Sequence, residues 1–103
     1  MSTLELENIK HPDNSGDNIA LASNGSITID RKSTDGTIAE FRKDGTTVGS
    51  IGTSFGDITI GGKSGLRFDT DSSQYVIPYN VTDNAHTTTV DLGTTDRRFK
   101  DAY

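Results

Sequence analysis

Residues 36–53, GTIAEFRKDGTTVGSIGT, have the pattern of a β-hairpin, and they indicate the fold class of the whole chain. The Asp44-Gly45 dipeptide is a strong signal for a two-residue hairpin turn. Because the side chains of a strand alternate between its two faces, this turn places apolar side chains on both faces of the hairpin. The predicted pairs are Phe41 with Val48 on one face and Ile38 with Ile51 on the other.

Two more hairpins are predicted on either side of this one. In residues 18–30, NIALASNGSITID, a three-residue loop that ends with Gly25 in the left-handed conformation aligns the apolar residues across the two strands. In residues 56–69, GDITIGGKSGLRFD, a glycine-rich turn does the same. The predicted pairs are Ile19 with Ile29 and Leu21 with Ile27 in the first, and Ile58 with Phe68 and Ile60 with Leu66 in the second.

The remainder of the chain is less regular. Residues 75–79, YVIPY, predict a short strand that Pro78 confines to an edge or an end. A further strand is expected over residues 87–92, and Thr94 or Thr95 can cap a single helical turn that brings Phe99 and Tyr103 to one side. We therefore expect an N-terminal connector (1–18), a β-hairpin domain (19–92) and a C-terminal connector (93–103).

The composition predicts a thin hydrophobic core. Only 30% of the 103 residues are hydrophobic, and Ile, Leu, Val and Phe together number 22. A domain of this size buries only about 60–70% of its unfolded surface even with a good core. We therefore expect the chain either to be partly disordered or to complete its core with other copies of itself.

Charge and residue types exclude several classes of function. The net charge of -5, with no basic stripe, argues against nucleic-acid binding, and no apolar run is long enough to insert into a membrane. Cysteine is absent, and His11 and His86 stand alone. Residues 69–73, DTDSS, are similar to the start of a calcium loop, but Gln74 and Asn80 occupy its glycine and closing acidic positions. We expect no enzymatic activity, no cofactor and no metal ion.

Tyr75 and Tyr79 are the only candidates for ligand contact. They lie four residues apart on the predicted strand, so both side chains point to one side. Exposed tyrosines on a β edge can stack on a sugar ring. The same two side chains can equally belong to an interface or a core, and the sequence favours that second interpretation.

Three stretches resemble tail-fibre and tailspike proteins of bacteriophages, of the marine and cyanobacterial type. Residues 8–30 are similar to the I-x-H-P-S-G-S-G-x-N-I segments of those fibres, with Asp13 and Asn14 in place of the usual Ser-Gly. Residues 36–53, with GDITIG and GLRF after them, are similar to a segment that recurs there. Residues 91–103, DLGTTDRRFKDAY, resemble an L-G-x-x-x-x-R-F-K-D-L-Y connector that normally leads into a further domain, with Ala102 where leucine is usual.

The resemblance implies an all-β fold in which short antiparallel hairpins form an intertwined or side-by-side trimeric fibre of β-prism or β-helix type. It implies a structural segment of a tail fibre on the virion that spaces or carries the host-receptor-binding element. Its partners would be two further copies and other virion tail proteins. The alternatives are a carbohydrate-binding β-sandwich that contacts host-surface glycan through Tyr75 and Tyr79, or a trimeric capsid-decoration protein. The predicted trimer core or interface comprises Ile19, Leu21, Ile27, Ile29, Ile38, Phe41, Val48, Ile51, Ile58, Ile60, Leu66, Phe68, Phe99 and Tyr103.

Overall fold

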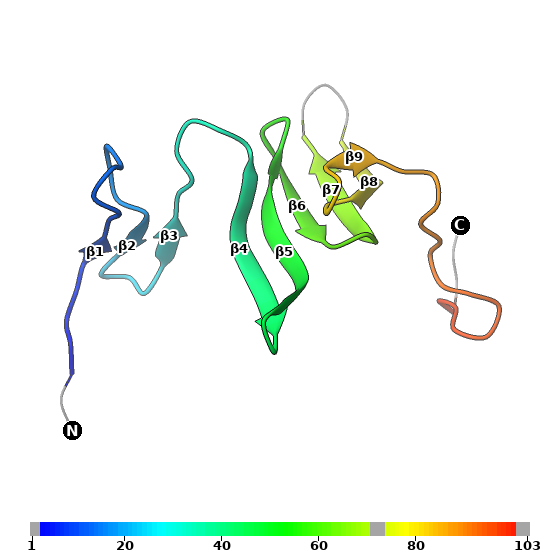
Figure 1. Cartoon of the computed structure of the whole chain (residues 1–103), viewed down its shortest axis with the longest axis horizontal. Coiled ribbons are helices and arrows are strands. Elements are labelled where there is room, and N and C mark those ends of the chain that lie inside the picture. The colour runs from blue at the N-terminus through cyan, green and yellow to red at the C-terminus, as the bar shows by residue number, and fades with distance from the viewer. Residues whose placement is uncertain (1–2, 71–73, 101–103) are drawn as a thin grey trace.

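The computed structural model describes residues 3–70 and 74–100, which form nine β-strands and no helix (Figure 1). All strands pair antiparallel with their neighbours in sequence, in a three-stranded sheet of order β1-β2-β3 and a six-stranded sheet of order β4-β5-β6-β7-β8-β9. The predicted all-β class with antiparallel hairpins is confirmed. The strands are β1 (Asn8–Ile9), β2 (Ile19–Leu21), β3 (Ile27–Ile29), β4 (Gly36–Lys43), β5 (Thr46–Ser54), β6 (Asp57–Gly61), β7 (Gly65–Asp69), β8 (Tyr75–Asn80) and β9 (Ala85–His86).

The hairpin of β2 and β3 has the predicted register. Ile19 lies opposite Ile29 and Leu21 opposite Ile27, and Gly25 has a φ of 91° in the three-residue loop. The Asn24 carboxamide oxygen accepts a hydrogen bond from the backbone N–H of Ser26, which holds the loop in shape. Loop chemistry and the apolar spacing agree here, which is why the register could be predicted. On its other side β2 pairs with β1, a strand that lies within the predicted N-terminal connector.

The hairpin of β4 and β5 has the predicted turn but not the predicted pairs. Asp44 and Gly45 both have positive φ, 50° and 80°, as a two-residue hairpin turn of this hand requires. Two irregularities in the register then shift the pairing, so that Phe41 lies opposite Gly49 instead of Val48, and Ala39 instead of Ile38 lies opposite Ile51. Each is a site where one strand carries an extra residue, in the manner of a β-bulge. As a result, Phe41 and Ile51 project from the same face of the sheet, not from opposite faces.

A second two-residue turn, Phe55-Gly56, joins β5 to β6 and was not predicted. Ser54 pairs with Asp57 across it, and Phe55 has a φ of 52°. A bulky residue rarely adopts this left-handed conformation, so the sequence carries no ordinary turn signal at this position. The next hairpin follows the prediction, with Ile60 opposite Leu66 and Gly61 opposite Gly65.

Strand β8 is the second strand from the β9 edge of the six-stranded sheet. It pairs with β7 along its length, whereas β9 pairs only with Tyr79 and Asn80. Among the described residues, Pro78 therefore has a partner strand on one edge of β8 only, that of β7. This is expected for a residue without a backbone N–H.

The C-terminal predictions were wrong in two respects. The expected strand over residues 87–92 is absent, because β9 ends at His86. The expected helical turn is also absent: Gly93, with a φ of 90°, forms an isolated bridge with Arg98. Between them the Thr94 hydroxyl oxygen accepts a hydrogen bond from the Arg97 N–H, and the Thr94 N–H donates to the Arg97 carbonyl. These bonds close a turn that reverses the chain, so no helix continues from it. Tyr103 lies outside the described residues.

The chain is extended and buries little of its surface. Its radius of gyration is 17.3 Å, against about 13 Å for a compact chain of this length. Its accessible surface is 8517 Å², against roughly 5,600 Å² for a self-contained folded chain of its mass. The two sheets follow one another along the longest axis in Figure 1. In the described part of the chain, Tyr79 is the one buried hydrophobic side chain.

Candidate functional site

The six-stranded sheet has two faces of opposite character. Because side chains alternate along a strand, the register assigns each residue to a face. The inner face carries polar side chains, and its members Ser54, Asp57 and Thr59 are buried together with Tyr79. The outer face carries apolar side chains and is largely exposed to solvent. The outer face comprises Ala39, Phe41, Ile51, Thr53, Ile58, Ile60, Leu66, Phe68, Val76 and Pro78, and the same alternation adds Lys43, Thr46, Asn80 and Ala85 at its ends.

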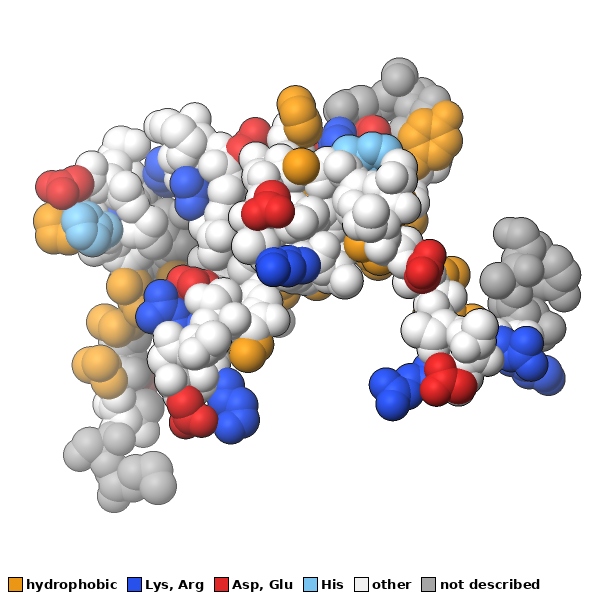
Figure 2. Space-filling view, turned by 45° about the vertical axis from the view of Figure 1, so that its right-hand side comes forward, with side chains coloured by type: hydrophobic (Ala, Val, Ile, Leu, Met, Phe, Trp, Pro, Cys, Tyr) orange, Lys and Arg blue, Asp and Glu red, His pale blue; other side chains and the backbone are white. Residues whose placement is uncertain are grey.

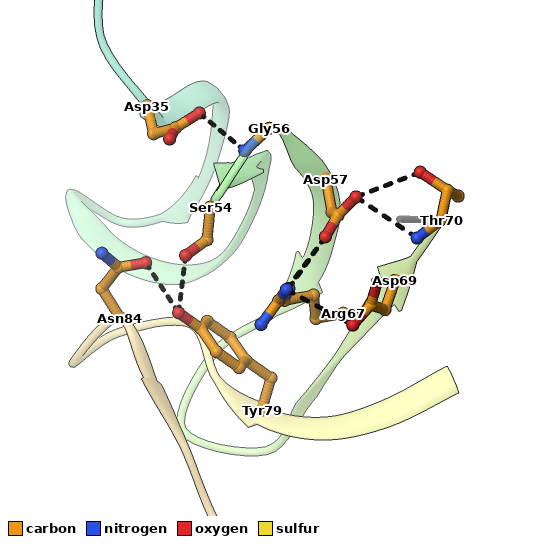
Figure 3. Close-up of polar contacts among 9 residues, drawn as sticks. All are labelled: Asp35, Ser54, Gly56, Asp57, Arg67, Asp69, Thr70, Tyr79 and Asn84. Carbon is orange, nitrogen blue, oxygen red and sulfur yellow. Dashed lines mark hydrogen bonds and ion pairs between the residues drawn. The ribbon is translucent and has the colours of Figure 1, made fainter. Parts of the chain in front are cut away.

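An ion pair between Asp57 of β6 and Arg67 of β7 lies on the inner face (Figure 3). The Arg67 Nε and Nη2 atoms both donate to one Asp57 carboxylate oxygen, at 3.1 and 3.0 Å. The other carboxylate oxygen accepts from the Thr70 hydroxyl at 3.1 Å and the Thr70 N–H at 3.4 Å. Asp69 lies 3.6 Å from the same guanidinium. The hairpin register explains the meeting, since Thr59 lies opposite Arg67 and Asp57 is its diagonal neighbour.

The surroundings of Asp57 favour its charged form. Burial alone raises the pKa of this carboxyl, but the hydrogen bonds from Arg67 and Thr70 and the charge of Arg67 outweigh it, so the pKa lies below its usual value. Glu40 also has a lowered pKa, because it accepts hydrogen bonds from Thr47 and Arg42 and faces the Arg42 charge. Both carboxylates are therefore ionised and engaged at neutral pH, which suits neither for general acid catalysis.

Phe55 covers this ion pair from the adjacent turn. The Arg67 guanidinium carbon lies 4.9 Å from the centre of the Phe55 ring, within the range of a cation–π contact. The turn is also held from the other side, because the Asp35 carboxylate accepts a hydrogen bond from the Gly56 N–H at 3.3 Å (Figure 3). The left-handed conformation of Phe55 thus goes together with a ring position over the Arg67 guanidinium.

Tyr79 of β8 connects its strand to β5 and to the turn before β9. Its hydroxyl lies 2.7 Å from the Ser54 hydroxyl and donates to the Asn84 carboxamide oxygen at 3.1 Å. The turn that follows β8 lies against the large sheet, since the backbone N–H of Val81 donates to the Gly62 carbonyl at 2.7 Å. In the described part of the chain every buried side-chain nitrogen or oxygen has a hydrogen-bond partner. The buried part of the inner face therefore leaves no unpaired polar side chain for a ligand among the described residues.

An apolar row crosses the outer face. Ala39 pairs with Ile51, Ile51 with Ile60, Ile60 with Leu66, and Leu66 with Pro78, so one row crosses five strands. At a strand spacing of about 4.8 Å this row is roughly 19 Å wide. A second row beside it includes Ile58 and Val76. Such a surface can be removed from water only by another apolar surface.

The structure brings together part of the predicted interface set. Ile51, Ile58, Ile60, Leu66, Phe68 and Phe41 lie on the outer face, whereas Ile19, Leu21, Ile27 and Ile29 share one face of the small sheet. Ile38 and Val48 lie at the register irregularities of β4 and β5, and Phe99 lies beyond the sheets, after the bridge of Gly93 with Arg98. Nine of these side chains are exposed in the single chain: Leu21, Ile27, Ile29, Phe41, Val48, Ile58, Ile60, Leu66 and Phe99.

The two candidate glycan contacts differ in accessibility. Tyr75 is 59% exposed, whereas Tyr79 is 1% exposed and hydrogen-bonded on the inner face. A ring that is buried in this way cannot stack on a sugar, so the pair does not form a two-ring platform. Sequence reasoning missed the polar cluster of Ser54, Asp57 and Arg67, although the correctly predicted register of the β6–β7 hairpin already placed Asp57 and Arg67 on one face.

Neither a metal-binding cluster nor a membrane-spanning helix is found among the described residues. No group of three or more His, Cys, Asp or Glu side chains within 3–70 and 74–100 could hold a metal ion, and residues 71–73 of the calcium-like stretch lie outside this part. No helix in the same part is long and apolar enough to span a bilayer. Figure 2 shows acidic and basic side chains scattered over one side of the molecule rather than gathered in a charged patch.

Comparison of the chain with protein-family models, with curated protein sequences and with solved structures returned no match. A function for this chain must therefore be argued from its structure, and the exposed apolar outer face is the feature used for that below.

Proposed function

We propose that this chain is a structural segment of a homotrimeric bacteriophage tail fibre, which spaces or carries the element that binds the host receptor. The observation that carries the proposal is the accessible surface of 8517 Å², roughly 2,900 Å² more than a self-contained chain of this mass exposes. A chain with so much surface in water is completed most simply by copies of itself in a closed cyclic assembly. The resemblance of three stretches to tail-fibre proteins supplies the biological setting.

The interior of the chain supports a structural role over a catalytic one. On the inner face, Asp57 and Arg67 are paired with one another, and the Phe55 ring lies over the Arg67 guanidinium. Their hydrogen bonds tie together strands β6 and β7 and the residue that follows β7. Cross-strand contacts of this kind stiffen a narrow sheet, which is what a spacer in a fibre needs.

The experiment that tests this proposal locates the chain on the particle. Antibodies raised against the purified protein and coupled to gold are applied to phage particles that encode this sequence, and the particles are viewed by electron microscopy. Gold along the tail fibres is the expected result. Gold distributed over the head would overturn the proposal in favour of the capsid-decoration alternative, and particles without gold would contradict both.

A further inference from the structure

We infer that the outer face of the six-stranded sheet is the surface through which copies of this chain associate, with the faces of three chains turned toward one axis. This inference rests on the proposed function and adds to it the surface by which the trimer forms. Its centre is the pair Ile60 and Leu66, the middle of the apolar row that crosses five strands. Both side chains are exposed in the single chain, at 42% and 39%.

Charge favours a second copy as the occupant of this face. Each chain carries a net charge of -5, so two copies repel one another wherever their carboxylates meet. The outer face carries no carboxylate among its described members, and Lys43 at the turn end of β4 is its one charged side chain, whereas Asp57, Arg67 and Asp69 all project from the inner face. Copies that meet through the outer faces therefore keep their charges away from the contact. A nucleic acid or a lipid headgroup would instead require cationic side chains there.

The whole chain has enough excess surface for an obligate interface, and the outer face supplies its apolar centre. Suppose that each chain of a threefold assembly buries its excess accessible surface of roughly 2,900 Å². Each chain takes part in two contacts and gives half of this area to each. Each contact, made by two chains, then buries about 2,900 Å² in total. Obligate interfaces bury about 2,000–5,000 Å² and resemble a domain core cut in half. The aliphatic row of Ile51, Ile60 and Leu66 has the composition of such a half core.

The chain has no cysteine, so single introduced thiols can report accessibility directly. Two variants are matched: Ile60→Cys on the outer face, and Leu92→Cys beyond the last strand of the sheet, where the native side chain is 70% exposed. Both are labelled with a maleimide in buffer and again after heating in SDS. The mass of each variant in solution is measured by light scattering in parallel.

The expected result is a trimeric mass for both variants, with Ile60→Cys labelled at least ten times more slowly than Leu92→Cys in buffer and equally fast after SDS. Equal rates in buffer on trimeric protein would overturn the inference while leaving the proposed function intact. A monomeric mass for the unmodified chain would overturn both.

A charge substitution gives a second, independent readout. Ile60→Asp places a carboxylate at the centre of the contact and is expected to lower the mass to that of one chain, whereas Leu92→Asp leaves the trimer unchanged. A trimeric Ile60→Asp variant, or dissociation of both variants alike, would contradict the assignment of the outer face. Far-ultraviolet circular dichroism identifies variants that retain their strands, and only those are compared.

Discussion

Replacing Tyr79 by phenylalanine removes one hydroxyl from the inner face and changes nothing else in the side chain. That hydroxyl lies 2.7 Å from the Ser54 hydroxyl and 3.1 Å from the Asn84 carboxamide oxygen. Ser54 is 2% exposed, so water cannot replace the lost partner. A buried polar group left without a partner costs about 1–3 kcal/mol, and we expect Tyr79→Phe to lower the free energy of unfolding by about 2 kcal/mol.

Urea denaturation followed by circular dichroism measures this loss. With a dependence of about 1–3 kcal/mol per molar urea, the midpoint is expected to fall by roughly 1 M at fixed protein concentration. Tyr75→Phe is the matched control, because it removes the same hydroxyl from an exposed ring on the same strand, and surface changes usually stay within about 0.5 kcal/mol. If the two variants unfold at the same urea concentration, the Tyr79 contacts do not stabilise the sheet and the reasoning fails.

Three further predictions concern pH and backbone packing. The pKa of Asp57 is lowered in the folded chain, so the unfolded chain takes up its proton first as the pH falls. The free energy of unfolding is therefore expected to hold above about pH 4 and to decrease below it. Urea midpoints between pH 7 and pH 3 measure this decrease, which must be smaller in an Asp57→Asn variant. Gly52→Ala would bring its Cβ to 2.3 Å from the Gly36 carbonyl oxygen, so β4 must move away from β5, and we expect a loss of about 1–3 kcal/mol. In Gly25→Ala the added Cβ has no atom within 4 Å, but the residue must keep a φ of 91°. This strained backbone is expected to lower the free energy of unfolding by only about 1 kcal/mol, less than in Gly52→Ala, as measured by thermal melting.

The fold could be predicted from the sequence where turn chemistry and apolar spacing agree. Gly25 after Asn24 defines a three-residue loop, and the matching Ile and Leu positions on either side fix the register. The same agreement gave the pairing of Ile60 with Leu66. It failed between β4 and β5, because an extra residue at a bulge leaves no mark in an alternating pattern.

Two other failures have local causes. The Phe55-Gly56 turn carries no turn signal, since its conformation depends on Arg67, a residue of another hairpin, and on Asp35. At the C-terminal end, the hydrogen bond from the Arg97 N–H to the Thr94 hydroxyl is the one that caps a helix. The second bond, from the Thr94 N–H to the Arg97 carbonyl, closes the turn instead, and the local sequence does not distinguish the two outcomes.

The outer face could be predicted in its parts but not as a whole. The β6–β7 hairpin gave its own apolar pair, yet the row from Ala39 to Pro78 exists only because the unpredicted turn at Phe55 joins β5 to β6 in the same sheet. Polar side chains are expected on the opposite face, but their burial was not expected. Burial of Asp57 with Arg67, and exposure of Ile60, reverse the usual distribution of a monomeric domain.

The solution mass of the purified chain tests the central claim most directly. Light scattering at micromolar concentration, with a gel of samples taken before and after heating in SDS, is predicted to give three times the 11.0 kDa of one chain in buffer, and 11.0 kDa only after heating. A stable, folded species of 11.0 kDa in buffer would contradict the claim that this chain completes its core with copies of itself.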